Sequence, residues 1–256
     1  MKLDILRKEA DLVKAYTKKI PLENEFIRAI INGIENADYL YREHMKVENF
    51  PTHNGDDGQK WNYINKAINE TLPVDRFQIE VMQRGIWQFI GIYDKITGYL
   101  YTLMRQKNLS TLRKNADTKL FHYTNALSKL NSYLAGDFAI ANEQMSLFPK
   151  ALYDEAGEEE LERILASLIK KIDNEIKCYV LVAFDISQGQ VTSIKGIVPS
   201  IGMMYFKEEN WNEALSPVYD IEENITETEV AEDVILLEHK PRLRRKEKKN
   251  DKKEKE

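Results

Sequence analysis

The sequence predicts an α+β fold, with N-terminal helices and an antiparallel or mixed sheet of about five strands that is flanked by helices. Three observations lead to this fold class. Apolar residues recur at helical spacing before residue 72 and again over 117–134 and 157–176. The segments 77–105 and 177–198 are instead rich in β-branched and aromatic residues and are divided by short turns. Apolar residues make up 43% of the 256 residues, which is enough for a globular core.

Three helices are expected in an N-terminal helical region, residues 1–72. They cover residues 2–19, 22–46 and 59–71. Pro21 separates the first helix from the second, because proline does not fit a helix interior. Residues 50–58 contain two glycines and a proline, so they are expected to form the loop before the third helix.

The sheet is expected in an α+β domain over residues 73–215. Its strands are predicted at 77–83, 86–93, 99–105, 177–185 and 191–198. The turn Asp94–Gly98 closes with glycine, so the first three strands should be adjacent and antiparallel. Alternation along the second strand directs Trp87 or its neighbour Gln88 toward the core. The helices of this domain are predicted at 117–134 and 157–176.

Charge is divided unevenly along the chain. Residues 240–256 carry ten Lys and Arg against four Asp and Glu, so this segment has a charge of +6 in a chain of −5. The rest of the chain therefore carries −11, and it ends in a weakly patterned acidic segment at 216–239. An acidic body argues against a broad DNA-binding face on the folded part. The basic segment has almost no apolar residues, which predicts a disordered tail.

The basic tail offers a candidate contact to DNA. Its first cations could neutralise phosphates through counterion release, weakly and without sequence preference. They are Arg242, Arg244, Arg245 and Lys246. A tail that only improves solubility has the same composition, so both interpretations stay open.

Several classes of protein leave no signal in the chain. No apolar run approaches 18 residues, so no membrane span is expected, and the charged N-terminus lacks a signal-peptide core. The lone Cys178 is expected to be a buried small hydrophobe in a reducing compartment, which favours a cytoplasmic protein. The four histidines have no metal-ligand spacing, and there is no phosphate loop or dinucleotide fingerprint. The sequence therefore predicts no metal and no cofactor.

The segment Gln144-Met145-Ser146-Leu147-Phe148 resembles the bacterial sliding-clamp-binding peptide, Gln-Leu-Ser/Asp-Leu-Phe. Such a peptide binds in extended form, so neighbouring side chains enter separate subsites. Leu147 and Phe148 would fill an apolar pocket, while Gln144 would supply directional amide hydrogen bonds. Ser146 suits a wet rim, and the flexible Met145 stands where leucine is commoner. The motif predicts the bacterial DNA polymerase sliding clamp as a partner.

The surroundings of the motif favour an exposed linear peptide. It lies in a linker predicted at 135–156, Pro149 follows it directly, and residues 154–162 are acidic. The alternative is that Leu147, Phe148, Leu152 and Tyr153 form an apolar lid over the core.

No side chain is assigned to catalysis. Glu80, Asp94 and Lys95 lie on or beside the first strands, as acids and lysine do in metal-dependent nucleases. Their spacing does not match such an enzyme, and a hairpin turn needs polar residues at two of these positions anyway. His122 could be a general base and Arg84 an anion ligand, yet structural roles suit both. The sequence favours a non-enzymatic protein.

Aromatic residues of the second and third predicted strands have two interpretations. They could form a platform on which nucleic-acid bases stack. A half-buried sheet places the same residue types in a core, and we favour the core. The residues are Trp87, Phe89, Tyr93, Tyr99 and Tyr101.

Seven stretches together resemble one family. They are Arg84–Phe89, Tyr93–Lys95, Leu100–Met104, His122–Asn131, Gln144–Phe148, Tyr179–Val182 and Glu209–Trp211. They are similar to a family of unknown function from low-GC Gram-positive bacteria, their phages and integrated elements. The resemblance covers roughly residues 60–215 and leaves the tail outside. A clamp-binding-like peptide has the same place in the family pattern. The family carries no agreed activity, so the resemblance implies a fold and a setting but no mechanism.

Two classes of function follow from the sequence. The first is an accessory protein that binds the sliding clamp and modulates replication or repair. The second is a nuclease-like enzyme or a phage-defence or counter-defence effector that the clamp delivers to nucleic acid. The observation that discriminates them is whether acidic side chains converge in a pocket.

Overall fold

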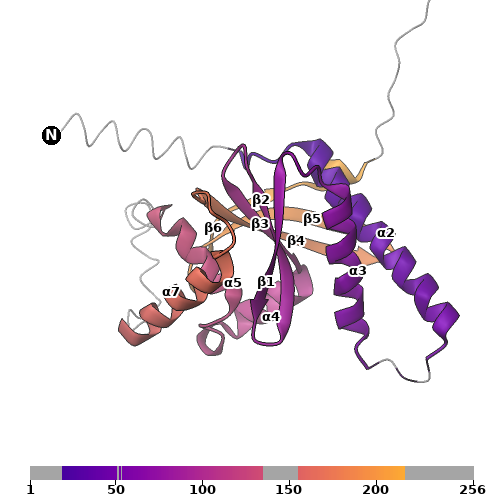
Figure 1. Ribbon diagram of the computed structural model, residues 1–256, viewed down its shortest axis with the longest axis horizontal. Coiled ribbons are helices and arrows are strands. Elements are labelled where there is room, and N and C mark those ends of the chain that lie inside the picture. Colours follow the sequence, from indigo (N-terminus) through magenta and orange to yellow (C-terminus); the bar gives the residue numbers. More distant parts are fainter. Residues whose placement is uncertain (1–18, 51, 53, 135–154, 217–256) are drawn as a thin grey trace, which may run out of the picture. The chain divides into compact units, whose positions relative to one another are not determined.

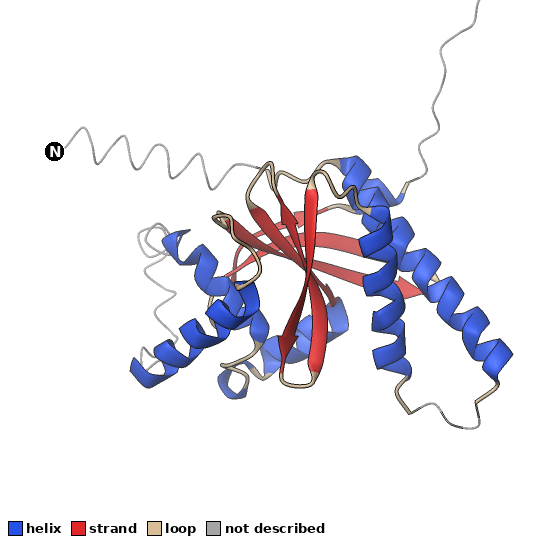
Figure 2. Cartoon of the chain, viewed as in Figure 1, coloured by secondary structure: helices blue, strands red, loops and turns tan. Residues whose placement is uncertain are grey.

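A six-stranded mixed sheet with helices on both faces forms the centre of the computed structural model (Figures 1 and 2). The structure describes residues 19–134, except 51 and 53, and residues 155–216. The predicted α+β class is confirmed over these residues. The expected helix 2–19 up to residue 18, the motif and the linker up to residue 154, the acidic segment beyond residue 216 and the basic tail lie outside them. The last two residues of the predicted linker, 155 and 156, belong to a helix.

The N-terminal helices α2 (Asn24–Glu48) and α3 (Asp56–Thr71) pack against each other and against one face of the sheet. Gly33 allows this approach, because a Cβ there would lie 2.9 Å from the Cδ1 of Ile68. Helix α3 begins three residues earlier than predicted and takes in part of the expected loop. Asp56 and Asp57 occupy its first turn, where carboxylates interact favourably with the helix dipole.

The first three strands are antiparallel neighbours, as predicted. They are β1 (Phe77–Arg84), β2 (Trp87–Asp94) and β3 (Tyr99–Arg105). The expected inward position of Trp87 or Gln88 is wrong, because both side chains are exposed. Strand β2 pairs with β3 only near its end, at Ile92 and Tyr93. The beginning of β2 therefore pairs with β1 alone, as the free end of a two-stranded ribbon.

The crossover from β3 to β4 differs most from the prediction. The unpredicted helix α4 (Gln106–Lys114) follows β3 directly. In place of one helix over 117–134 there are η1 (Ala116–Thr118), α5 (Tyr123–Ser128) and η2 (Lys129–Leu134). Helix α5 starts only at Tyr123 because the His122 side chain caps it by accepting from the backbone N–H of Thr124. Helix α7 (Glu155–Ile169) ends seven residues before the predicted end.

The second half of the sheet contains β4 (Cys178–Ser187), β5 (Gln190–Pro199) and β6 (Tyr205–Asn210), followed by the short helix η5 (Asn212–Leu215). Strand β4 is parallel to β3, and every other neighbouring pair is antiparallel, in the order β1-β2-β3-β4-β5-β6. The first seven residues of β4 are buried, including the free thiol of Cys178. Strand β6 has no apolar alternation, so the prediction of about five strands missed it.

Two apolar clusters lie on opposite faces of the sheet. One joins α2, α3 and η5 to the sheet, and the other joins it to α4, α5 and α7 (Figure 1). The predicted core role of the hairpin aromatics holds for Phe89, Tyr93 and Tyr101, whereas Trp87 is 38% exposed. Among the described residues, no helix has both the length and the apolar character needed to cross a membrane.

A buried asparagine fastens the crossover to the sheet. The Asn131 amide donates to the carbonyls of Tyr179 and Pro199, at 2.9 Å each, and its oxygen accepts from the Tyr179 N–H at 2.8 Å. Asn125 similarly accepts from the N–H of Gly202. Both asparagines lie in a stretch that resembles the family, and the structure gives them architectural roles.

Candidate functional site

The residues that are predicted to bind the clamp or DNA all lie outside the described part of the chain. Gln144, Met145, Ser146, Leu147 and Phe148 fall between the end of η2 and the start of α7. The tail residues Arg242, Arg244, Arg245 and Lys246 follow the last described residue. The side chains with candidate chemistry that the structure does describe are those of the first hairpin and its neighbours.

Asp94 has a structural environment. Its side chain is fully buried, and its carboxylate accepts from the Arg76 guanidinium at 2.8 Å. It also accepts from the backbone N–H groups of Ile96 and Thr97, at 2.9 and 3.3 Å, and so closes the turn to β3. Burial alone would raise the pKa of Asp94, but these hydrogen bonds hold it below its usual value.

The other two candidates of the nuclease interpretation do not join Asp94. The Lys95 ammonium donates to the carbonyl of Val74 at 2.7 Å, so it ties the turn to the start of β1. Glu80 accepts from Gln78 at 3.1 Å and lies 3.8 Å from the ammonium of Lys171. Within the described ranges, no three His, Cys, Asp or Glu side chains converge as a metal site would require.

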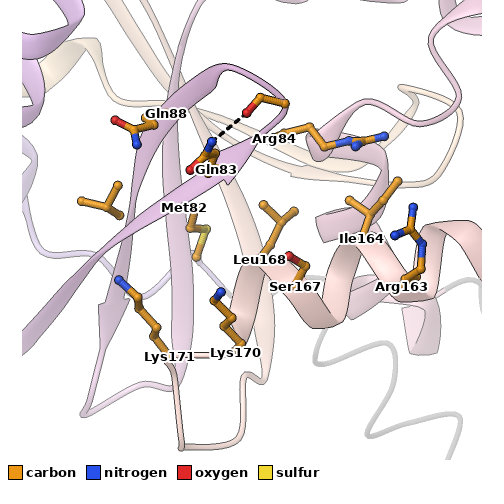
Figure 3. A pocket seen from close by; sticks show the side chains of 12 residues that line it. Met82, Gln83, Arg84, Gln88, Arg163, Ile164, Ser167, Leu168, Lys170 and Lys171 are labelled. Carbon is orange, nitrogen blue, oxygen red and sulfur yellow. Dashed lines mark hydrogen bonds between the residues drawn. The ribbon is translucent and has the colours of Figure 1, made fainter.

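A basic pocket lies between the β1–β2 hairpin and α7, with a volume of about 430 Å³. Four cationic side chains line it: Arg84, Arg163, Lys170 and Lys171. Figure 3 shows the two arginines near one end and the two lysines near the other. Polar groups of Gln83, Gln88 and Ser167 complete the lining above an apolar floor that includes Met82 and Leu168. This chemistry suits an anion with several oxygen acceptors.

An aromatic pocket of about 460 Å³ lies beside the same hairpin, toward α3 and α4. Trp87 and Trp61 meet edge to face at 6.3 Å, and Phe89 stacks on Tyr123 at 4.1 Å. Polar atoms come from Asn108 and Thr111 of α4 and from His122. Such a lining suits a planar ring with polar edges.

His122 contributes a neutral imidazole to this pocket. Burial and the nearby charges of Lys119 and Arg84 lower the pKa of His122 to about 4. Its Nδ1 is already engaged by the Thr124 N–H, at 3.2 Å. The sequence singled out His122 as a candidate base, and the structure adds a capping role.

Arg84 connects the two pockets. It lines both of them, at the last position of β1 before the hairpin tip. Its Nε donates to the carbonyl of Phe121 at 3.4 Å, and its guanidinium lies 3.9 Å from Glu160. The sequence identified Arg84 as a candidate anion ligand. It missed Arg163 of α7 and the two lysines that follow this helix, Lys170 and Lys171, whose only signal was their spacing along one predicted helix.

The fold and the site define an α+β protein with a six-stranded mixed sheet and two adjoining pockets at its first hairpin. The chain belongs to DUF5986, a family of unknown function, whose model matches residues 19–256. The match is wider than the sequence resemblance of residues 60–215 and includes the basic tail. No match was found among curated proteins or solved structures.

Proposed function

We propose that this protein is an accessory factor that binds the bacterial DNA polymerase sliding clamp through residues 144–148 and modulates replication or repair. The observation that carries the proposal is the motif itself, a glutamine, a methionine, a small polar serine and the pair Leu147-Phe148. In the sequence, the motif lies between η2 and α7. Its 20-residue connection, 135–154, is long enough to contain an extended peptide.

The energetics of such a contact are those of a short peptide. Leu147 and Phe148 would each contribute about 1.5–3 kcal/mol on full burial. The peptide loses conformational entropy when it docks, so a micromolar dissociation constant is expected, about −8 kcal/mol.

The setting we propose is the cytoplasm of low-GC Gram-positive bacteria, with the protein encoded by a phage or mobile element. The charge pattern adds DNA as a second partner, because the clamp encircles DNA and the tail carries cations such as Arg242 and Arg244. The alternative proposal is a nucleic-acid-acting enzyme or effector that the clamp delivers. The basic and aromatic pockets favour contact with nucleic acid, but they name no catalytic group.

A synthetic peptide of residues 142–150 tests the proposal. We expect it to bind purified bacterial clamp with micromolar affinity, measured by fluorescence anisotropy, and to compete with a known clamp ligand. The Met145→Leu peptide should bind at least as tightly, because it restores the commoner residue at that subsite. A peptide that neither binds nor competes would overturn the proposal.

The tail has a separate test. Replacing Arg242, Arg244, Arg245 and Lys246 together by glutamine should weaken the binding of duplex DNA at low salt. The difference should vanish at high salt, because screening and counterion release govern such contacts. An unchanged affinity at low salt would assign the tail to solubility alone.

A further inference from the structure

We infer that the two pockets beside the β1–β2 tip together bind single-stranded nucleic acid, with phosphates in the basic pocket and an unstacked base in the aromatic pocket. Two complementary chemistries meet there on one hairpin, and Arg84 belongs to both pockets. The inference goes beyond clamp binding and does not depend on it.

The charge of the basic pocket fits a strand better than a single anion. Its lining has four cations, and none of the lining residues is acidic. Glu160 holds Arg163 at 2.7 Å, and Glu80 lies 3.8 Å from Lys171, so two nearby carboxylates offset half of the charge. Among the ion pairs of the described residues, none involves Lys170. A net positive pocket remains.

The cations are also spread along the pocket. Figure 3 shows Lys170 and Lys171 side by side below Met82, away from the arginines beside Ile164. Two separated pairs of cations can meet two successive phosphates of one strand, as grooves for single strands do.

The aromatic pocket fits a base. Trp87 is 38% exposed although it packs edge to face with Trp61, so part of its indole remains accessible for stacking. The Asn108 amide offers both a donor and an acceptor to the edge of a base. The Thr111 hydroxyl donates to the carbonyl of Lys107 at 3.0 Å, so it offers an acceptor. The neutral imidazole of His122 adds a polar group without a charge.

The position of the pockets favours a single strand over a duplex. The tip residues Gly85 and Ile86 are exposed, and the aromatic pocket is lined from three helices as well as from the sheet. A base inside a stacked duplex would have to leave the stack to enter that pocket, whereas a base of a single strand needs no unpairing.

The test titrates the full chain with oligothymidylate and, in a second arm, with oligouridylate. Binding is followed by anisotropy and by tryptophan emission. Stacking on Trp87 should quench the emission, and Trp87→Leu should remove most of the quenching and weaken binding about tenfold. Quenching by either strand supports the site, and the tighter one identifies DNA or RNA as the ligand.

A charge variant with a matched control tests the phosphate side. Lys170→Gln/Lys171→Gln should weaken binding at least about tenfold and reduce the slope of log affinity against log salt by about 1.4. Lys46→Gln/Lys66→Gln removes two lysines, 73% and 71% exposed, from helices α2 and α3, and it should leave binding unchanged. Neutralising Arg242, Arg244, Arg245 and Lys246 should leave the quenching intact.

Three results would overturn the inference. The first is an equal affinity of Lys170→Gln/Lys171→Gln and of the control Lys46→Gln/Lys66→Gln for the oligonucleotide. The second is that neither oligonucleotide quenches the tryptophan emission. The third is that duplex DNA quenches the emission as strongly as a single strand does.

Discussion

Asp94→Ala is expected to lower the free energy of unfolding by about 3 kcal/mol or more, the largest stability effect of a single substitution at the polar residues described above. The carboxylate is fully buried and holds Arg76 at 2.8 Å. The substitution would leave that guanidinium, only 13% exposed, without its buried partner and would remove the acceptor for Ile96 and Thr97. Urea unfolding followed by circular dichroism measures the change.

The matched control removes the other carboxylate of the same arginine. Glu23 contacts Arg76 at 2.6 Å but is 55% exposed, so Glu23→Gln should cost no more than about 1 kcal/mol. Equal losses for the two variants would contradict a structural role for Asp94.

The same carboxylate predicts a dependence on pH. Because the pKa of Asp94 is held below its usual value, its contribution to stability is present above about pH 4 and is lost as the pH falls through the folded-state pKa. The wild-type protein should therefore lose stability in acid more steeply than Asp94→Ala, and parallel acid profiles would contradict the assignment.

Leu147→Ala/Phe148→Ala in the full chain is expected to weaken clamp binding at least about a hundredfold, because both apolar anchors are lost. Phe148→Ala alone should account for most of the loss. Gln144→Ala should cost about 1 kcal/mol through its hydrogen bonds. Leu152→Ala, an apolar truncation in the same segment but outside the motif, should leave clamp binding unchanged.

The double variant also discriminates the clamp peptide from a lid on the core. An exposed peptide contributes little to folding, so the thermal midpoint of the double variant should match that of the wild type. A lid would lose two buried side chains, and the midpoint would fall by several degrees.

The sequence predicts the sheet well where its signal is local. Alternation and turn residues identify β1 to β3 and β4 to β5 within three residues at each end. Strand β6 is not predicted, because Tyr205–Asn210 is largely polar and its position depends on pairing with β5. The helix expected over 117–134 is broken because buried hydrogen bonds of Asn125 and Asn131 fix the chain in another path. Such contacts join residues far apart in sequence, so the spacing of apolar residues along the chain does not predict them.

The candidate functional residues also differ in how far the sequence alone predicts them. A motif of five adjacent residues such as Gln144–Phe148 can be recognised from the sequence alone. The basic pocket needs Arg84 of the hairpin to meet Lys170 and Lys171, which lie more than eighty residues further along. The prediction that Trp87 or Gln88 faces the core failed for a related reason, since β3 does not extend alongside the beginning of β2.

Calorimetric titration of the full chain into purified bacterial sliding clamp tests clamp binding most directly. We expect a saturable heat with a micromolar dissociation constant, abolished by Leu147→Ala/Phe148→Ala and reduced by a known clamp ligand. The absence of any heat, together with no competition against that ligand, would contradict it.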